Sequence, residues 1–109
     1  MIYLASPYTD PDPEVMTFRH DCVERYIIVS LAHNLFIFSP VVYFHRMALK
    51  YKLPDEQAFW LNICFRIFND AEALWVLQLN GWDKSTGVTA EIEFAEDRSI
   101  PIKYISWQE

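Results

Sequence analysis

The chain has 109 residues, 52% of them hydrophobic and 17% aromatic, which is enough apolar material for one core-forming domain over residues 1–109. Its formal net charge of −6 disfavours a broad surface that neutralises nucleic-acid phosphates. No apolar run reaches membrane-spanning length, and the first residues lack the basic start of a signal peptide. We therefore expect a cytoplasmic protein whose two cysteines, Cys22 and Cys64, are reduced and buried.

Apolar runs bounded by proline, glycine and polar turns predict the elements in chain order. We expect strands over 2–5, 35–38, 73–79 and 101–106, and helices over 13–33, 53–71 and from residue 86. A short helix around residues 43–51 is a weaker prediction. The expected buried faces are Val15, Phe18, Cys22, Tyr26 and Val29 on the first long helix, and Phe59, Ile63 and Ile67 on the next.

Alternation of strands with helices predicts the fold class. The order β-α-β-α-β-α-β favours an α/β three-layer sandwich, in which right-handed crossovers place helices on both faces of a parallel sheet. We expect four strands in the order 2-1-3-4, a flavodoxin-like or Rossmann-like arrangement.

The stretch 85–95 follows the third predicted strand and is the strongest candidate for a binding site. Ligands of such sheets bind where strands end and helices begin, and a helix N-terminus favours an anion. Ser85 and Thr86 are good N-cap candidates, and Gly87 allows the backbone to approach a ligand closely.

The helical phase separates the two acids of this stretch. Val88, Ile92 and Ala95 fall on one stripe; Glu91 lies at its edge, and Glu93 faces the opposite side. We expect Glu93 to be solvated and Glu91 to be carried towards the core and the mouth of the sheet. The alternative is that Glu91 is a boundary residue stabilised by the nearby helix N-terminus.

For several other polar and aromatic residues, the sequence allows either a structural role or a role in a binding site. His20, His33 and His45 share no ligand spacing, so we expect no metal site and no cofactor. Arg19 either reaches a phosphate from the first helix or lies on the solvated face of that helix. His45 and Arg46 follow the second strand, and whether they line the pocket is left open by the sequence. Two roles are possible for Trp60, Trp75 and Trp82: packing in the core and interfaces, or stacking against a nucleotide base. Trp82, in the loop after the third predicted strand, is placed where it could do either.

Three motifs resemble nucleoside 2-deoxyribosyltransferases and, more closely, 2′-deoxynucleoside 5′-phosphate N-hydrolases. They are Tyr3-Leu4-Ala5-Ser6-Pro7-Tyr8 at the start, Gly81-Trp82 after the third strand, and Ser85-x-Gly87-x-x-x-Glu91. The resemblance extends over essentially the whole chain, and a branch of small uncharacterised proteins shares the same motifs.

The resemblance implies a role for each matching position. Glu91 stands where the family keeps the nucleophile that attacks the anomeric carbon of the sugar, and Tyr3 where a tyrosine lies close to it. Ser85 matches a phosphate-binding serine and Gly87 the glycine that opens the helix. The remaining implied substrate contacts are Ser6, Pro7 and Tyr8, in the loop over the nucleotide, and Trp82. Related proteins are dimers or larger, so a homodimer or higher homo-oligomer is implied.

One departure from the family pattern affects catalysis. Cys64 occupies the place of an aspartate that handles the leaving base. Asn62 lies half a turn away and Asp10 or Asp12 could fold over the site, but none of them matches the family position. Tyr3, Tyr8 or a water are the other candidates to donate a proton. We therefore expect either N-glycosidic cleavage or deoxyribosyl transfer on a nucleotide, or a non-catalytic nucleotide-binding protein on the same fold. The well-formed strand–Ser–Gly–Glu block argues against a purely structural interaction domain.

Overall fold

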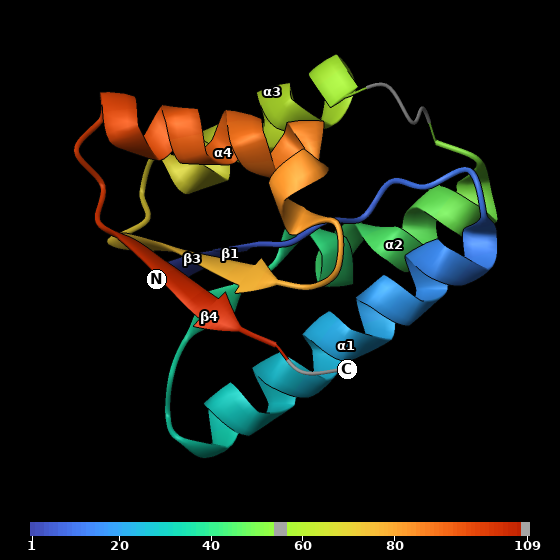
Figure 1. The fold of residues 1–109 in the computed structure, drawn as a ribbon, viewed down its shortest axis with the longest axis horizontal. Helices are drawn as coiled ribbons and strands as arrows, with labels where there is room; N and C mark the ends of the chain where they lie inside the picture. The colour runs from blue at the N-terminus through green and yellow to red at the C-terminus, as the bar shows by residue number, and fades with distance from the viewer. Residues whose placement is uncertain (54–56, 108–109) are drawn as a thin grey trace.

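The protein is an α/β sandwich built on four parallel strands (Figure 1). We describe residues 1–53 and 57–107 of a computed structural model. Its elements are β1 (Ile2–Ala5), α1 (Pro13–Ala32), β2 (Ile37–Phe38), α2 (Pro40–Tyr51), α3 (Gln57–Phe68), β3 (Ala73–Gln78), the 3-10 turn η1 (Trp82–Lys84), α4 (Thr86–Asp97) and β4 (Ile102–Ser106). The sheet order β2-β1-β3-β4 confirms the predicted 2-1-3-4 arrangement.

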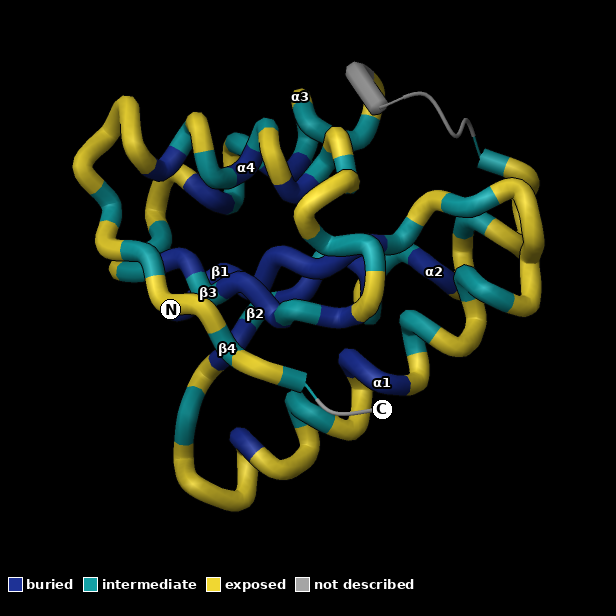
Figure 2. Tube along the Cα trace, viewed as in Figure 1, coloured by how far each residue is buried: buried dark blue, intermediate teal, exposed yellow. Residues whose placement is uncertain are grey.

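Strand β1 is the centre of the sheet and separates two apolar clusters. Successive side chains of a strand point to opposite faces. Ile2 and Leu4 pack with α1 on one face, whereas Tyr3 and Ala5 pack with α3 and α4 on the other. Figure 2 shows that the central strands are the most deeply buried part of the chain. This two-sided burial explains why the strands are continuous apolar runs.

Helix α2 begins earlier than predicted, at Pro40 rather than near residue 43. The Ser39 side chain caps it by accepting a hydrogen bond from the Val42 amide at 3.2 Å. Proline is favoured at the first helical position, since its φ fits the helix and it needs no amide partner. The Ser39-Pro40 pair is thus a helix start as well as a strand end.

Two further boundaries are corrected by the structure. Strand β2 covers only Ile37–Phe38 of the predicted 35–38. The preceding residues are used by the end of α1, where Asn34 has a φ of 60° and the Leu35 amide donates to the Ser30 carbonyl. Helix α3 ends at Phe68 rather than residue 71. Of its predicted start at residue 53, residues 54–56 lie outside those described.

The predicted helix faces were partly wrong. On α1 the buried residues are Cys22, Val23 and Ser30, while Phe18 and Val29 are exposed. The strands under this helix are much shorter than the helix itself, so only its middle is covered by the sheet. On α3 the buried face contains Cys64 and Phe68 rather than Phe59. The described helices include none that is long and apolar enough to cross a membrane.

Candidate active site

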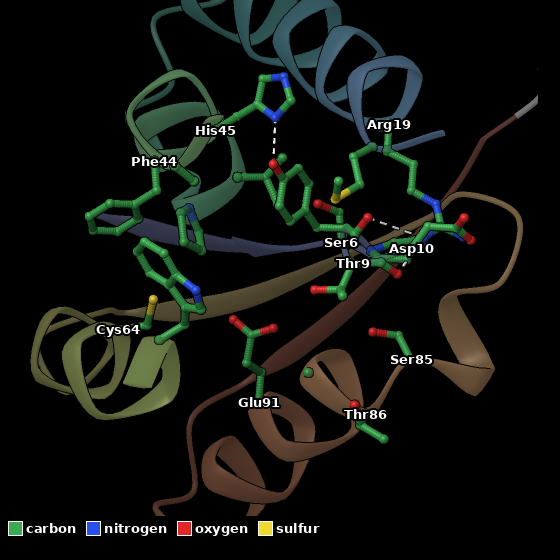
Figure 3. A pocket seen from close by; sticks show the side chains of 18 of the residues that line it. Ser6, Thr9, Asp10, Arg19, Phe44, His45, Cys64, Ser85, Thr86 and Glu91 are labelled. Carbon is green, nitrogen blue, oxygen red and sulfur yellow. Dashed lines mark hydrogen bonds between the residues drawn. The ribbon is translucent and has the colours of Figure 1, made fainter. Parts of the chain in front are cut away.

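A cavity of about 700 Å³ lies at the carboxyl ends of the strands (Figure 3). This volume lies within the usual range for small-molecule sites, and the location is where ligands bind in open parallel sheets. It is lined by Ser6, Pro7, Tyr8, Thr9, Asp10, Met16, Arg19, Pro40, Val41, Phe44, His45, Ala48, Leu49, Leu53, Trp60, Leu61, Cys64, Gly81, Lys84, Ser85, Thr86, Gly87 and Glu91. The loops after β1 and β3, together with Arg19 and the start of α4, form its polar end, and α2 and α3 form its apolar end.

The N-terminus of α4 forms one wall of the polar end. Ser85 is the N-cap, and its hydroxyl accepts a hydrogen bond from the Val88 amide at 3.2 Å. The first amides of a helix have no partner within the helix, so Thr86 and Gly87 present donors at the cavity wall. A methyl group added at Gly87 would meet nothing closer than the Ser85 hydroxyl, 3.8 Å away. The fold itself therefore does not require glycine there, whereas close approach of a ligand would.

Arg19 holds the loops of the polar end together. Its guanidinium donates to the carbonyls of Tyr8 at 3.3 Å, Thr9 at 3.1 Å and Asn80 at 3.4 Å. Gly81 has a φ of 90°, and a side chain there would come within 3.1 Å of the Arg19 guanidinium. Among the described residues Arg19 forms no salt bridge with a carboxylate. Its charge is therefore not held in an ion pair within the described residues, although the Asp10 carboxylate lies near it at the same end of the cavity (Figure 3).

Glu91 reaches the middle of the cavity from the second turn of α4 (Figure 3). It is buried with Val88 and Ala95, while Glu93 is exposed, which confirms the phase predicted for the two acids. Burial raises the pKa of the Glu91 carboxyl to about 8, and the neighbouring Tyr3 hydroxyl partly offsets this rise. The neutral acid is thus the main form at neutral pH.

Burial outweighs any stabilisation of the Glu91 carboxylate by the nearby helix N-terminus. The favourable effect of a helix dipole fades within the first turn. Ser85 caps that turn, and Glu91 lies beyond it in a position closed off from water. Desolvation of the charged form therefore dominates.

Cys64 lines the cavity, whereas Tyr3 lies beneath its floor, close to Glu91. Tyr3 is completely buried and stacks on Phe68 with ring centroids 4.2 Å apart. Burial raises the pKa of the Tyr3 hydroxyl, and Glu91 and Cys64 raise it further by their charges. Burial likewise raises the pKa of the Cys64 thiol to about 11. Tyr3, Cys64 and Glu91 are therefore an electrostatically coupled group whose neutral forms are favoured.

Two buried hydroxyls at the site lack a hydrogen-bond partner among the described residues. They belong to Tyr3 and Ser6, and Ser6 lines the cavity. A buried polar group without a partner is costly, by about 1–3 kcal/mol. Such groups are common where a ligand or water completes the site. Ser6 is thus a polar residue at the cavity wall whose hydrogen bond a ligand or water would complete.

At the apolar end, α2 and α3 meet through aromatic side chains. The rings of Phe44 and Trp60 lie 5.0 Å apart with a tilt of 55°. Cys64 follows Trp60 by one turn of α3, on the same side of that helix. Figure 3 shows Phe44 and Cys64 on the side of Glu91 opposite to Ser85 and Thr86. This end suits a flat apolar group rather than a charged oxygen.

Tyr8, from the loop after β1, and His45, from α2, form a pair at the cavity wall. The Tyr8 hydroxyl and His45 Nδ1 are hydrogen-bonded, and the His45 ring stacks on His20 at 4.5 Å. Burial lowers the pKa of His45, and His20 lowers it further, while Asp21 partly offsets both. Burial raises the pKa of Tyr8. Both partners are therefore uncharged near neutral pH.

One sequence family covers nearly the same residues as the fold. A profile described as "Domain of unknown function (DUF1937)" matches residues 1–107, nearly the whole chain. The chain belongs to the DUF1937 family. No curated protein matches it. For this DUF1937 chain the geometry of the site is therefore the main guide to function.

The DUF1937 cavity brings together most of the site residues that the sequence predicts. Ser6, Pro7, Tyr8, Ser85, Gly87 and Glu91 all line it. Tyr3 lies under its floor, and Trp82 does not line it but packs against Tyr104, with ring centroids 5.7 Å apart. The described residues contain no cluster of acids, histidines and cysteines that could hold a metal ion.

The structure shows which of the candidate residues line the cavity, and it adds Phe44 to them. Arg19 and His45 line the cavity, whereas Arg46 does not. Trp60 lines it from α3 and Phe44 from α2; the sequence analysis did not single out Phe44. The sequence did contain a signal for the α3 side of this wall. Trp60, Cys64 and Phe68 follow one another by one helical turn each, which marks the inner face of α3.

Asp10 is the second carboxylate at the cavity. It lies at the polar end near Arg19 (Figure 3), and its side chain accepts a hydrogen bond from the Asp12 amide at 2.9 Å. Asp12 itself is exposed and caps α1. Asn62 is exposed and does not line the cavity. None of these three residues takes the place that the resemblance assigns to an aspartate at position 64.

Proposed function

We propose that the chain binds nucleoside 5′-monophosphates and cleaves or exchanges their N-glycosidic bond, with Glu91 as the nucleophile. The observation that carries this proposal is the position of Glu91, a buried carboxyl between an anion-binding end and an aromatic end of one cavity. A nucleotide has the same order of parts: a phosphate, a sugar with its anomeric carbon, and a flat base.

The polar end supports binding of the phosphate. Amides at the start of α4 and the Arg19 guanidinium both favour an anion. Lys84 adds a second positive charge at the same wall. Because Glu91 is mainly protonated in the free site, it does not repel the phosphate when the ligand enters.

Catalysis by Glu91 needs its proton to leave first. The carboxylate oxygen would attack the anomeric carbon, the bond from that carbon to the base nitrogen would break, and a glycosyl ester would form. Water, or a second base in a transfer reaction, would then displace the carboxylate. The Tyr3 hydroxyl, which lowers the pKa of Glu91, is suited to stabilise the ionised acid.

A non-catalytic nucleotide-binding protein is the second candidate. Two observations favour it: Cys64 replaces the acid expected beside the leaving base, and burial keeps Glu91 largely protonated. In this reading the cavity would bind a nucleotide in order to sense or sequester it. The polar end would have the same role in both candidates.

The experiment that separates the two is incubation with a panel of nucleoside 5′-monophosphates, ribo and 2′-deoxyribo, followed by chromatography of released base. An enzyme should release base in the wild type, and Glu91→Gln should lower the rate by several orders of magnitude. Glu93→Gln is the matched control, because Glu93 lies two residues away on the exposed side of α4. Absence of release by the wild type, together with measurable binding, would establish the second candidate.

Ligand preference gives a second readout that does not depend on turnover. A 5′-monophosphate should bind more tightly than its free nucleoside, because charge-assisted hydrogen bonds contribute about 1.5–3 kcal/mol each. Calorimetry on wild type and Glu91→Gln measures both affinities. Equal affinities would contradict the assignment of the polar end to a phosphate.

We also propose that the chain forms a homodimer or a higher homo-oligomer. The residues that support this lie at the end of α1 and in the loop after it, where Ile28, Leu31 and Phe36 are all exposed. Contiguous exposed apolar side chains mark interaction surfaces. Sedimentation of the wild type and of Phe36→Ser compares the masses directly.

A further inference from the structure

The apolar end of the cavity lacks a group suited to protonating a departing base. The titratable side chains at or beside it, in the described part of the chain, are Cys64 on α3, His45 on α2 and Tyr8 in the loop after β1. Tyr8 is hydrogen-bonded to His45, and burial disfavours the charged form of each. The Cys64 thiol is a weak donor with a pKa of about 11. A neutral base leaves as an anion unless it gains a proton, so this end disfavours its departure.

The same end is suited to a positively charged ring. The adjoining rings of Phe44 and Trp60 line this end, and the faces of aromatic rings attract a cation placed over them. The positive side chains that line the cavity, Arg19 and Lys84, belong to the polar end, so they do not oppose a cation at the aromatic wall. Asp10 also lies at the polar end, next to Arg19 (Figure 3).

Glu91 also favours a cationic ring at the apolar end, since it faces the space between the two ends. An opposite charge within a few ångströms stabilises the ionised form of an acid. A cationic leaving group beside Glu91 would therefore favour loss of its proton and so create the nucleophile. The same charge makes an acid unnecessary, because the leaving group departs as a neutral molecule.

We propose that the cavity is specific for N-glycosides of a cationic nitrogen heterocycle, such as a pyridinium or an N-alkylated base, attached to a 5′-phosphorylated sugar. The proposal rests on the glycosidic function of Glu91 argued above and names its substrate class. The aromatic wall of Phe44 and Trp60 binds the ring, and Arg19 with the start of α4 binds the phosphate.

Each step of the reaction balances without an added proton donor. A Glu91 carboxylate oxygen bonds to the anomeric carbon, and the carbon–nitrogen bond breaks with both electrons going to the ring nitrogen. The ring thereby loses its positive charge and leaves as a neutral heterocycle. Water then bonds to the anomeric carbon and displaces Glu91, which takes up one proton from that water. The products are the heterocycle, the 5′-phosphorylated sugar and protonated Glu91.

The test compares nicotinamide mononucleotide, whose ring is permanently cationic, with adenosine 5′-monophosphate, each as the ribo and 2′-deoxyribo form. Rates are divided by the uncatalysed rate in the same buffer, because the two bonds differ in intrinsic stability. A general acid contributes about 10²–10⁴-fold. Because the apolar end lacks a general acid, the wild-type rate enhancement for nicotinamide mononucleotide should exceed that for adenosine 5′-monophosphate by about a hundredfold or more. Cys64→Asp should narrow this ratio by accelerating the neutral substrate.

A binding measurement keeps the proposal testable if Cys64→Asp does not fold. Calorimetry of nicotinamide mononucleotide near neutral pH, in two buffers of different ionisation enthalpy, counts the protons released on binding. The wild type should release close to one proton with this ligand, and fewer with its reduced, uncharged-ring form. Glu91→Gln should release none with either.

The outcomes separate this inference from the function on which it rests. Equal rate enhancements for both substrates, lost in Glu91→Gln, would overturn the cation preference and leave the glycosidic function standing. Proton release equal for the oxidised and reduced ligands would overturn it as well. If Tyr8→Phe abolished release of adenine, Tyr8 would be the acid and the inference would fall. Cleavage of no substrate would overturn both proposals together.

Discussion

The two ends of the cavity are built in different ways. At the polar end the ligand-facing groups come largely from backbone: the loops after β1 and β3 and the first amides of α4, held in place by Arg19. At the apolar end they are side chains of α2 and α3, such as Phe44 and Trp60. Backbone donors recognise an anion whatever it is attached to, whereas side chains can change without altering the fold. Under the proposed function, we therefore expect specificity to be set at the apolar end.

Glu91 lies between the two ends and responds to both. Its carboxyl is neutral in the free site because of burial, and a charge at either end would change that. An anion at the polar end favours the protonated form, and a cation at the apolar end favours the ionised form. Experiments that change pH or one end at a time can therefore separate recognition from chemistry.

The largest expected effect is that of pH on the reaction rate. Since burial raises the pKa of Glu91 to about 8, release of a neutral base should rise with pH and level off above that value. The increase should be roughly tenfold per pH unit below the plateau. Rate profiles of the wild type and the Glu93→Gln control measure it. A rate that falls as pH rises would mean that Glu91 works as a protonated acid instead.

Removing the positive charge of the polar end should have the next largest effect. Arg19→Met should weaken binding of a 5′-monophosphate by about 10–100-fold, corresponding to one charge-assisted hydrogen bond. Binding of the free nucleoside should change little. Arg25→Met is the control, because Arg25 lies on the exposed side of the same helix. A similar loss for nucleoside and nucleotide would show that Arg19 acts only by holding the loops.

The third effect is on stability. The unfolded carboxyl titrates near 4.5 and the folded one near 8, so between these values the folded state of the wild type holds more protons. The stabilisation is complete below the lower value and is lost as pH rises to the upper one. Relative to Glu91→Gln, the wild type should lose about 2 kcal/mol between about pH 5.5 and about pH 7.5.

Urea unfolding at several pH values measures this difference in the free energy of unfolding. Glu93→Gln should follow the wild type, because Glu93 is exposed in the folded state. A constant difference between wild type and Glu91→Gln would mean that Glu91 is as well solvated in the folded protein as in the unfolded chain.

The features that the sequence predicted best are those fixed by local periodicity. The contrast between Glu91 and Glu93 follows from helical phase alone, and the structure confirms it. The sheet order follows from alternating strands and helices, and it is confirmed as well. The start of α2 at Pro40 was equally predictable from the Ser39-Pro40 pair, since serine is a favoured helix cap and proline a favoured first helical residue.

What the sequence could not predict depends on contacts between distant elements. Phe44 and Trp60 form one wall only because α2 packs beside α3. Arg19 of α1 reaches the Asn80 carbonyl in the loop after β3, a contact between residues 61 positions apart in the chain. The raised pKa of Glu91 could not be predicted either, since desolvation depends on the closed surroundings that the whole fold provides.

The smallest effect uses two serines with the same local geometry. Ser85 and Ser39 cap α4 and α2, each accepting a hydrogen bond from the amide three residues later at 3.2 Å. Replacing either by alanine should lower the free energy of unfolding by about 1 kcal/mol, the usual effect of losing a cap. Ser85 lines the cavity and Ser39 does not. Ser85→Ala should therefore also narrow the affinity gap between nucleotide and nucleoside, while Ser39→Ala should leave that gap unchanged. If both variants lose stability but neither alters the gap, Ser85 is only a helix cap, and anion recognition rests on Arg19 and the amides of α4.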